Sequence, residues 1–204
     1  MGRIFVIMGK SATGKDTIYK RLMEQKDCSL KEVVIYTTRP IRSGETNGKE
    51  YFFVNSEKLR DYESSPRLIE LRTYHTMLGL WHYFTMDDGQ IDLSIQDYLM
   101  ISTLVGYERI RAYYGAEAVV PIYIETEDRE RLMRSVAREE CQPQPNYAEV
   151  CRRYLADESD FAEAEIKRLE IKKRYWNDDL EQCLAEIRQD IESLLERGQV
   201  LHGH

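Results

Sequence analysis

Near its N-terminus the chain reads Ile4-Phe5-Val6-Ile7-Met8-Gly9-Lys10-Ser11-Ala12-Thr13-Gly14-Lys15. The five consecutive apolar residues are typical of a strand that is buried on both faces of a parallel sheet. The next seven fit the spacing G-x-x-x-x-G-K, in which the backbone wraps around phosphate groups and the lysine holds the terminal ones. A helix is predicted over Lys15–Lys26, with Ile18 and Leu22 on its inner side. This strand, loop and helix together predict a phosphate-binding loop.

The loop predicts its own contacts with a nucleoside triphosphate such as ATP. The expected ATP-binding residues are Gly9, Lys10, Ser11, Ala12, Thr13, Gly14, Lys15, Asp16 and Thr17. Asp16 stands where a serine or threonine hydroxyl normally contacts Mg²⁺ in such loops. Because a carboxylate is a hard oxygen ligand, Asp16 is the candidate metal ligand, either directly or through water.

Outward from the loop, strand and helix patterns alternate, which predicts an α/β fold with a parallel sheet. Buried-strand patterns occur at Val33–Tyr36, Tyr98–Ser102 and Val119–Glu125, and a helix is expected over Leu104–Tyr114. The part between them predicts a small β-rich insertion, with short strands at Tyr51–Val54, Leu68–Tyr74 and Trp81–Thr85. Further helices are expected at Asp128–Glu139, Tyr147–Asp157 and Asp179–Glu196.

Composition excludes several classes of protein. The 204 residues are 42% hydrophobic and carry a net charge of −7, so the chain can fill a core. Its longest apolar run is far shorter than the roughly 20 residues of a membrane span, and we expect a soluble cytoplasmic protein. An acidic surface disfavours binding to nucleic acid or to an anionic membrane. The scattered cysteines, Cys28, Cys141, Cys151 and Cys183, predict reduced structural thiols.

A second candidate anion site lies in the polar segment Thr37–Val54. Arg39 and Arg42 present planar forks that suit a phosphate, and the Tyr51 hydroxyl can donate to the same group. Glu45 is placed to orient an arginine. This segment resembles the acceptor-binding segment of guanylate kinases, which reads T-R-x-x-R-x-G-E-x-x-G-x-x-Y-x-F-V with the same spacing. A solvated basic loop is the alternative interpretation.

The resemblance extends from about Arg3 to Leu195 and implies further site residues. Glu70 matches the glutamate that reads guanine in this family, although a salt-bridged structural glutamate is an alternative. Asn177 opens the N-D-D-L motif beside the family's adenine pocket, which implies a contact with ATP. Arg134, Arg138 and Arg153 fall near the arginines of the family's lid, which closes on the transferred phosphoryl group. Arg131 is predicted to lie on the same helix face as Arg134 and Arg138, and an ordinary salt-bridged face would also explain these arginines.

Four departures from the family pattern concern mainly the acceptor base and the metal. Tyr36 replaces a guanine-contacting serine, and the family's G-N-x-Y-G-T turn is missing. The D-x-D of the third core strand appears as Ile101 and Thr103, although we keep Thr103 as a candidate acceptor-binding residue. The lid turn is replaced by residues 142–145. The phosphate-handling parts are therefore retained, whereas the base-reading parts are altered.

The resemblance implies a P-loop kinase: a parallel core sheet flanked by helices, a small β-rich acceptor-binding insertion and a helical lid. It implies one domain, with its core at about 1–36, 96–126 and 160–204, its insertion at 37–95 and its lid at 127–159. The implied reaction uses ATP with Mg²⁺ to phosphorylate a nucleoside monophosphate, GMP or dGMP, with weakened preference for guanine. Lys15, Arg39, Arg134, Arg138 and Arg153 are the expected catalytic residues.

Two other functions stay open at this point. One is phosphorylation of a ribose bisphosphate or another small phosphorylated acceptor, because that related group also carries G-K-D in its loop. The other is a catalytically inactive guanylate-kinase-like module that binds a phosphorylated partner. Such modules characteristically lose the ATP loop, whereas Gly14 and Lys15 are retained here.

Overall fold

The computed structural model describes residues 1–25, 29–42, 44–76 and 79–200. Its main sheet has five parallel strands in the order β2-β7-β1-β8-β9. Their bounds are β1 Ile4–Met8, β2 Leu30–Glu32, β7 Asp97–Ile101, β8 Val119–Glu125 and β9 Arg174–Trp176. Strand β1 lies in the centre and all five of its residues are buried. The predicted α/β fold with a parallel core sheet is confirmed.

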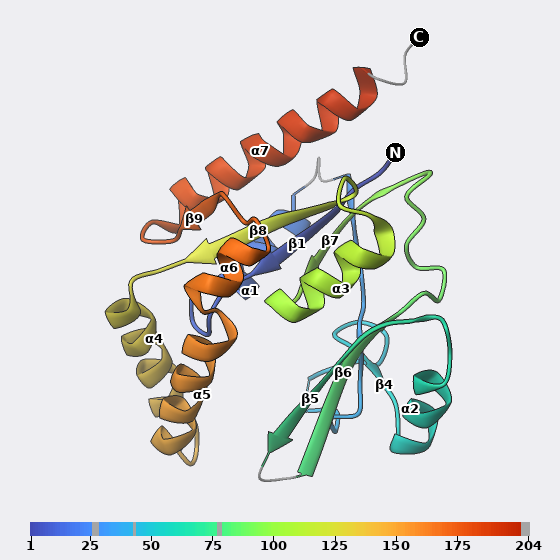
Figure 1. Ribbon diagram of the computed structural model, residues 1–204. Coiled ribbons are helices and arrows are strands. Elements are labelled where there is room, and N and C mark those ends of the chain that lie inside the picture. The colour runs from blue at the N-terminus through green and yellow to red at the C-terminus, as the bar shows by residue number, and fades with distance from the viewer. Residues whose placement is uncertain (26–28, 43, 77–78, 201–204) are drawn as a thin grey trace.

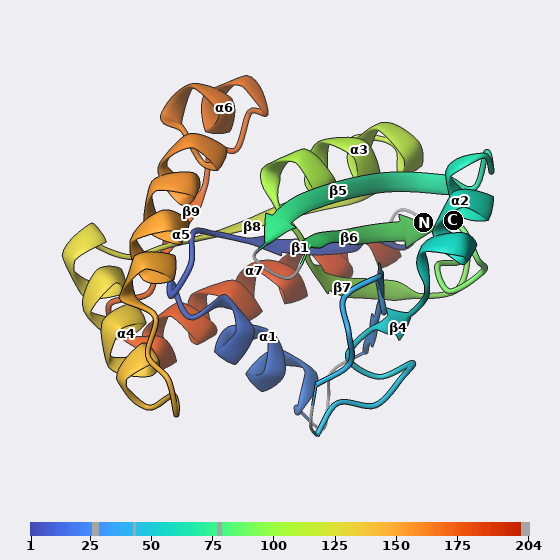
Figure 2. The ribbon, with the colours of Figure 1, turned by 90° about the horizontal axis from the view of Figure 1, so that it is seen from below.

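Helices cover both faces of this sheet, because alternate residues of β1 point to opposite sides. Ile4, Val6 and Met8 pack in one core with residues of α3 (Leu104–Tyr114) and α6 (Glu163–Arg168). Phe5 and Ile7 pack in the other core with α1 (Lys15–Met23) and α7 (Leu180–Val200). Figure 2 shows α3 on one side of the strands and α1 with α7 on the other. Among the described residues, no helix combines the length and apolar character that a membrane crossing requires.

A second sheet of four strands lies in the segment predicted to be the insertion. Its order is β4-β3-β6-β5, with bounds β3 Tyr36–Thr37, β4 Phe52–Phe53, β5 Leu68–Thr76 and β6 Gly79–Met86. Strands β5 and β6 form a long antiparallel hairpin. Helix α2, Ser56–Glu63, begins after Asn55, whose side chain accepts from the backbone N–H of Lys58. A small core that includes Tyr36, Leu59 and Phe84 holds this sheet and helix together.

The remaining helices, α4 (Asp128–Glu140) and α5 (Tyr147–Asp160), form an antiparallel pair after β8. Figure 1 shows this pair and the β5–β6 hairpin on opposite sides, both below the main sheet. Figure 2 shows α1 between α4 on one side and β4 on the other. The phosphate loop at the start of α1 therefore lies in the region that both outlying units flank.

Several predicted element boundaries are wrong. Residues 33–35 form no strand: β2 in the main sheet ends at Glu32, before the expected strand Val33–Tyr36, and only Tyr36 of that range lies in a strand, β3 of the second sheet. The reason is tertiary pairing, because Tyr36 pairs with Phe84 of β6 and leaves the main sheet. Helix α1 ends at Met23, before the predicted Lys26. The sequence also gave no prediction of α2, α6 or β9.

Candidate active site

The loop after β1 is held in shape by contacts from distant parts of the chain. A Cβ atom on Gly9 would lie 2.5 Å from the carbonyl oxygen of Ile124, so β8 leaves no room for a side chain. Gly14 adopts φ 88°, a left-handed conformation that favours glycine. Asn177 donates from Nδ2 to the carbonyl oxygen of Thr13 at 2.7 Å, and both residues are buried. Ala12 also has a positive φ of 62°, which marks a constrained backbone within the loop.

Lys15 begins α1, and its ammonium group lies 3.4 Å from the carbonyl oxygen of Lys10 on the opposite side of the loop. Burial lowers the pKa of Lys15, and the nearby positive charges of Arg153 and Arg138 lower this pKa further. The carboxylates of Asp16 and Asp157 act in the opposite direction. Lys15 of α1 is therefore close enough to Arg138 of α4 and Arg153 of α5 for their positive charges to repel one another.

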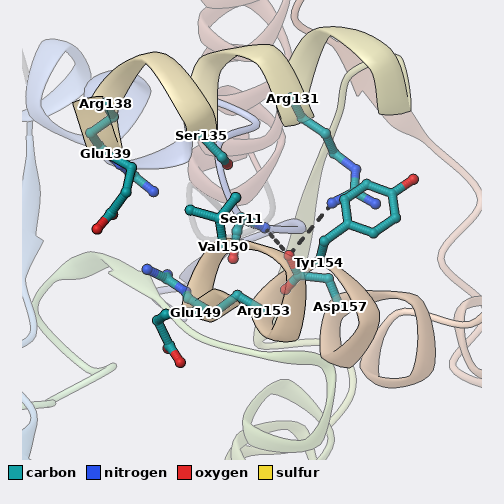
Figure 3. A pocket seen from close by; sticks show the side chains of 10 residues that line it. All are labelled: Ser11, Arg131, Ser135, Arg138, Glu139, Glu149, Val150, Arg153, Tyr154 and Asp157. Carbon is teal, nitrogen blue, oxygen red and sulfur yellow. Dashed lines mark hydrogen bonds and ion pairs between the residues drawn. The ribbon is translucent and has the colours of Figure 1, made fainter. Parts of the chain in front are cut away.

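A pocket lies between α4 and α5 and opens onto the phosphate loop through Ser11. Figure 3 shows Arg138 projecting from α4 and Arg153 from α5, on either side of this pocket. The structure thus brings two of the three predicted lid arginines together. It places Arg134 elsewhere, with Nε donating to Glu130 and Nη2 donating to the carbonyl oxygen of Asn177 at 3.3 Å. Arg134 accordingly lies beside the N-D-D-L motif.

The lid helices are fastened to the phosphate loop by a network of charges. The Asp157 carboxylate accepts from the backbone N–H of Ser11 at 2.8 Å (Figure 3). Arg131 lies 3.6 Å from the same carboxylate and also pairs with Asp128 and Glu158. Its side chain is 2% exposed. A chain of direct contacts therefore joins α4, α5 and the loop that is predicted to bind ATP.

Two further contacts complete this network. The Arg131 guanidinium carbon lies 4.0 Å from the ring centroid of Tyr154 on α5, which is a close cation–π contact. From the loop itself, the Lys10 ammonium donates to Glu158 at 2.7 Å. Sequence reasoning placed Arg131 on the cationic face of the helix and overlooked Asp157. The spacing of three residues between Asp128 and Arg131 was the available signal for an ion pair.

The predicted acceptor segment folds so that Arg39 is buried and held in place. Its guanidinium makes a bidentate pair with Glu45, at 2.9 and 2.8 Å, and its carbon lies 5.2 Å from the Tyr51 ring centroid. Glu45 therefore orients an arginine, as its position in the segment predicts. Burial raises the pKa of Tyr51, which keeps its hydroxyl protonated and able to donate. The Arg42 side chain is exposed, while its backbone N–H donates to Glu45.

The residues at the positions where the resemblance implies base contacts are already engaged with the protein. Glu70 is 1% exposed and pairs with Arg72, the geometry of the salt-bridged alternative. Tyr36 lies within the core of the second sheet and donates from its hydroxyl to Asp88 at 2.6 Å. Thr103 caps α3 by accepting from the backbone N–H of Gly106 at 3.2 Å. The polar face that sequence reasoning missed here is Arg72 with Tyr83, which lie opposite each other on the β5–β6 hairpin.

Asp16 and Thr17 are exposed in the first turn of α1, so their oxygen atoms are accessible. Within the described ranges, no group of three or more His, Cys, Asp or Glu side chains could hold a metal ion. Cys141, Cys151 and Cys183 are free thiols, and Cys28 lies outside the described residues. The protein therefore offers single oxygen ligands near Lys15, and no closed metal cage appears in the part of the chain that the structure describes.

Comparisons with known proteins show what the chain is similar to. Residues 1–84 match the family model for guanylate kinase. The guanylate kinase of Porphyromonas gingivalis is 26% identical over 194 residues, which span 94% of this chain and 97% of the relative. That of Rhodopirellula baltica is 37% identical over 87 residues, 43% of this chain and 41% of the relative.

A solved structure extends the likeness to the fold. The crystal structure of guanylate kinase from Anaplasma phagocytophilum matches with a TM-score of 0.62 and 21% identity, covering 94% of this chain and 85% of that one. The sequence match is strongest in the half that holds the phosphate loop and the acceptor segment, and the fold match spans both halves. By sequence the chain is similar to guanylate kinases, and by fold it matches a solved guanylate kinase structure.

Proposed function

We propose that the protein transfers the γ-phosphoryl group of ATP to GMP or dGMP and releases ADP with the nucleoside diphosphate. The observation that carries this proposal is that Arg138 and Arg153 line one pocket with Ser11 of the phosphate loop, close enough to Lys15 for their charges to lower its pKa. Positive groups held close together favour an anion between them. A phosphoryl group in transit between two phosphates is such an anion, and dense positive charge is what its transfer requires.

On the donor side, Lys15 and the loop amides hold the β- and γ-phosphates, and Asn177 supports the loop from behind through Thr13. Mg²⁺ is the expected cofactor. Its fit rests on Asp16, a hard oxygen donor that lies close enough to Lys15 to raise the pKa of that lysine. One carboxylate is an ordinary protein contribution to Mg²⁺, which takes most of its other ligands from phosphate oxygens and water. When bound, the ion neutralises charge on the triphosphate.

On the acceptor side, Arg39, Arg42 and Tyr51 bind the monophosphate group. Glu45 keeps the Arg39 fork in one orientation, so that little side-chain freedom is lost when the phosphate binds. Thr103 and Glu70 are proposed to lie at the nucleoside end of the same site. The acceptor is thereby held with its phosphate towards the loop.

In the transfer step, an oxygen of the acceptor phosphate forms a bond to the γ-phosphorus, while the bond from that phosphorus to the β–γ bridging oxygen breaks. The electron pair of the broken bond stays on ADP. Arg138 and Arg153 stabilise the charge on the transferred group, and α4 with α5 exclude water from it. Arg134 is proposed to act beside them, from its position next to Asn177.

We further propose that the chain works as one domain with its core at about 1–36, 96–126 and 160–204, its acceptor insertion at 37–95 and its lid at 127–159. The four-stranded sheet and the α4–α5 pair support this division. We also propose a cytoplasmic location, where ATP and GMP are available. No comparison favours a ribose-bisphosphate kinase or an inactive binding module, and retention of Lys15 argues against the module.

The test is ADP formation with GMP, measured for the natural chain, for Lys15→Ala and for Lys20→Ala. Lys20 is an exposed lysine on the same helix and serves as the matched control. Lys15→Ala should lower kcat by at least about 100-fold, because it removes a charge that stabilises the transferred group. Lys20→Ala should leave kcat unchanged. Binding of GMP by the natural chain without any ADP formation would instead identify a binding module.

A further inference from the structure

Both oxygens of the Glu70 carboxylate, which would read guanine, already accept hydrogen bonds from a neighbouring guanidinium. Arg72 donates from Nε to Glu70 Oε2 at 2.9 Å and from Nη2 to Oε1 at 3.1 Å. Thr85 donates from its hydroxyl to the same Oε1 at 2.8 Å. Guanine would need these two oxygens for its N1 and N2 hydrogens. Opening the pair would leave a buried carboxylate and a guanidinium to find new partners, which is costly.

Arg72 itself lies on the acceptor side of the hairpin. On β5 it shares a face with Glu70 and Tyr74, and it stands opposite Tyr83 on β6. The Tyr83 ring centroid is 5.6 Å from that of Tyr51, the predicted phosphate-binding tyrosine. The positive charge of Arg72 acts on Tyr51 directly. Arg72 therefore faces the site that binds the monophosphate.

Tyr83 also connects the surroundings of Arg39 and Arg72. It stands opposite Arg72 in the hairpin, and its ring centroid is 5.6 Å from that of Tyr51, over whose ring the Arg39 guanidinium carbon lies at 5.2 Å. Each arginine is matched by one glutamate, Arg39 by Glu45 and Arg72 by Glu70. The acceptor site thus has two guanidinium groups, each paired with a glutamate. Arg39 lies at the predicted phosphate end and Arg72 at the predicted base end.

We infer that Arg72, and not Glu70, is the residue that reads the acceptor base. A guanidinium only donates hydrogen bonds, and the pair with Glu70 uses its Nε and Nη2 atoms, which leaves the Nη1 end outside that pair. The base atom that meets Arg72 must then be an acceptor. The protein accordingly selects monophosphates whose base presents a carbonyl oxygen, and it does not read the 2-amino group of guanine. This inference rests on the proposed phosphorylation of a nucleoside monophosphate.

The test compares GMP, IMP and XMP, which carry an amino group, a hydrogen or a carbonyl oxygen at C2 of the base; XMP also carries a hydrogen on N3. Both kcat/KM and the Kd from calorimetry are measured for each. We expect the natural chain to take the three within about threefold of one another. In Arg72→Met, Glu70 is released and should favour GMP by about 10- to 100-fold, the effect of charge-assisted hydrogen bonds. Arg60→Met, an exposed arginine on α2, is the control and should match the natural chain.

Two further variants keep the test decisive. Glu70→Gln should leave the three ratios unchanged, and the double variant Arg72→Met with Glu70→Gln should lose the new preference for GMP. If Arg72→Met does not fold, the ratios of the natural chain and of Glu70→Gln decide the matter.

Three results would overturn the inference. One is a tenfold preference of the natural chain for GMP over both other acceptors that disappears in Glu70→Gln. Another is a folded Arg72→Met whose ratios equal those of the natural chain. The third is an absence of binding to all three, which overturns the proposed function as well. Binding within threefold without ADP formation would refute only the proposed function and would support Arg72 as the base reader.

Discussion

Replacing Gly14 with alanine should break a hydrogen bond made by a residue 163 positions away, Asn177. At φ 88° an L-residue costs about 1–2 kcal/mol. The new Cβ would also lie 2.2 Å from Asn177 Nδ2, so the amide must leave the Thr13 carbonyl. Losing that buried bond costs about 1–2 kcal/mol, at the lower end of the usual range because the Thr126 hydroxyl lies 3.4 Å from the same oxygen. Gly14→Ala should therefore lower the free energy of unfolding by about 2–4 kcal/mol.

A double-mutant cycle separates the two contributions. Asn177→Ala removes only the hydrogen bond and should cost about 1–2 kcal/mol. In the double variant the bond is lost once and the clash is gone, so the total should again be about 2–4 kcal/mol. The coupling between the two sites is then about 1–2 kcal/mol, which urea unfolding can resolve.

Gly89 provides the matched control for this cycle. It has φ 89°, and a Cβ there would meet nothing within 4 Å. Gly89→Ala should therefore cost only the backbone contribution of about 1–2 kcal/mol and should add to Asn177→Ala without coupling. The reasoning is refuted if Gly14→Ala costs no more than Gly89→Ala. It is also refuted if Gly14→Ala and Asn177→Ala are additive within about 0.5 kcal/mol.

Two further predictions concern the acceptor segment and the lid. The hydrogen bond from Arg39 holds the pKa of Glu45 below its ordinary 4.5, so Glu45 contributes stability above that pH and loses it as the pH falls through the lowered pKa. Glu45→Gln should reduce the free energy of unfolding at pH 6 and reduce it much less at low pH. The exposed control Glu117→Gln should follow the natural chain. Parallel curves of unfolding free energy against pH for Glu45→Gln and the natural chain would contradict this prediction. ATP and GMP together should slow amide hydrogen exchange across Arg131–Arg153 more than either alone, and exchange unchanged by both would refute lid closure.

The parts of the fold that local sequence specifies were predicted well. The run Ile4–Met8 and the glycines after it define a strand and a loop without help from the rest of the chain. By contrast, Tyr36 joins the second sheet because its ring packs on Phe84 and Phe52. The distances between ring centroids are 5.1 Å and 4.8 Å, and no local pattern reveals these contacts. Helix α2 was missed because Leu59 is its one buried residue, although Asn55 is an ordinary helix cap.

The candidate site shows the same division. Arg39 and Glu45 are six residues apart in one segment, so the sequence of that segment alone was enough to predict that Glu45 orients an arginine. Arg131 looked like one more arginine on a cationic helix face, but the carboxylate of Asp157 and the ring of Tyr154 bury it. Likewise, the sequence left Glu70 open between a base contact and a salt bridge, and the strand geometry that brings Arg72 beside it was needed to reveal the ion pair.

The way in which the phosphate loop is supported has a consequence for protein synthesis. The loop spans residues 9–15, yet its shape depends on Ile124 behind Gly9, on Asp157 at Ser11 and on Asn177 at Thr13. A ribosome exposes these supports only after most of the chain has emerged, because the N-terminus is made first. The loop is therefore translated well before its supports and reaches its working shape only after they have been made. Nascent chains that end before Asn177 should lack a formed nucleotide site, and binding of ATP would mark a completed molecule.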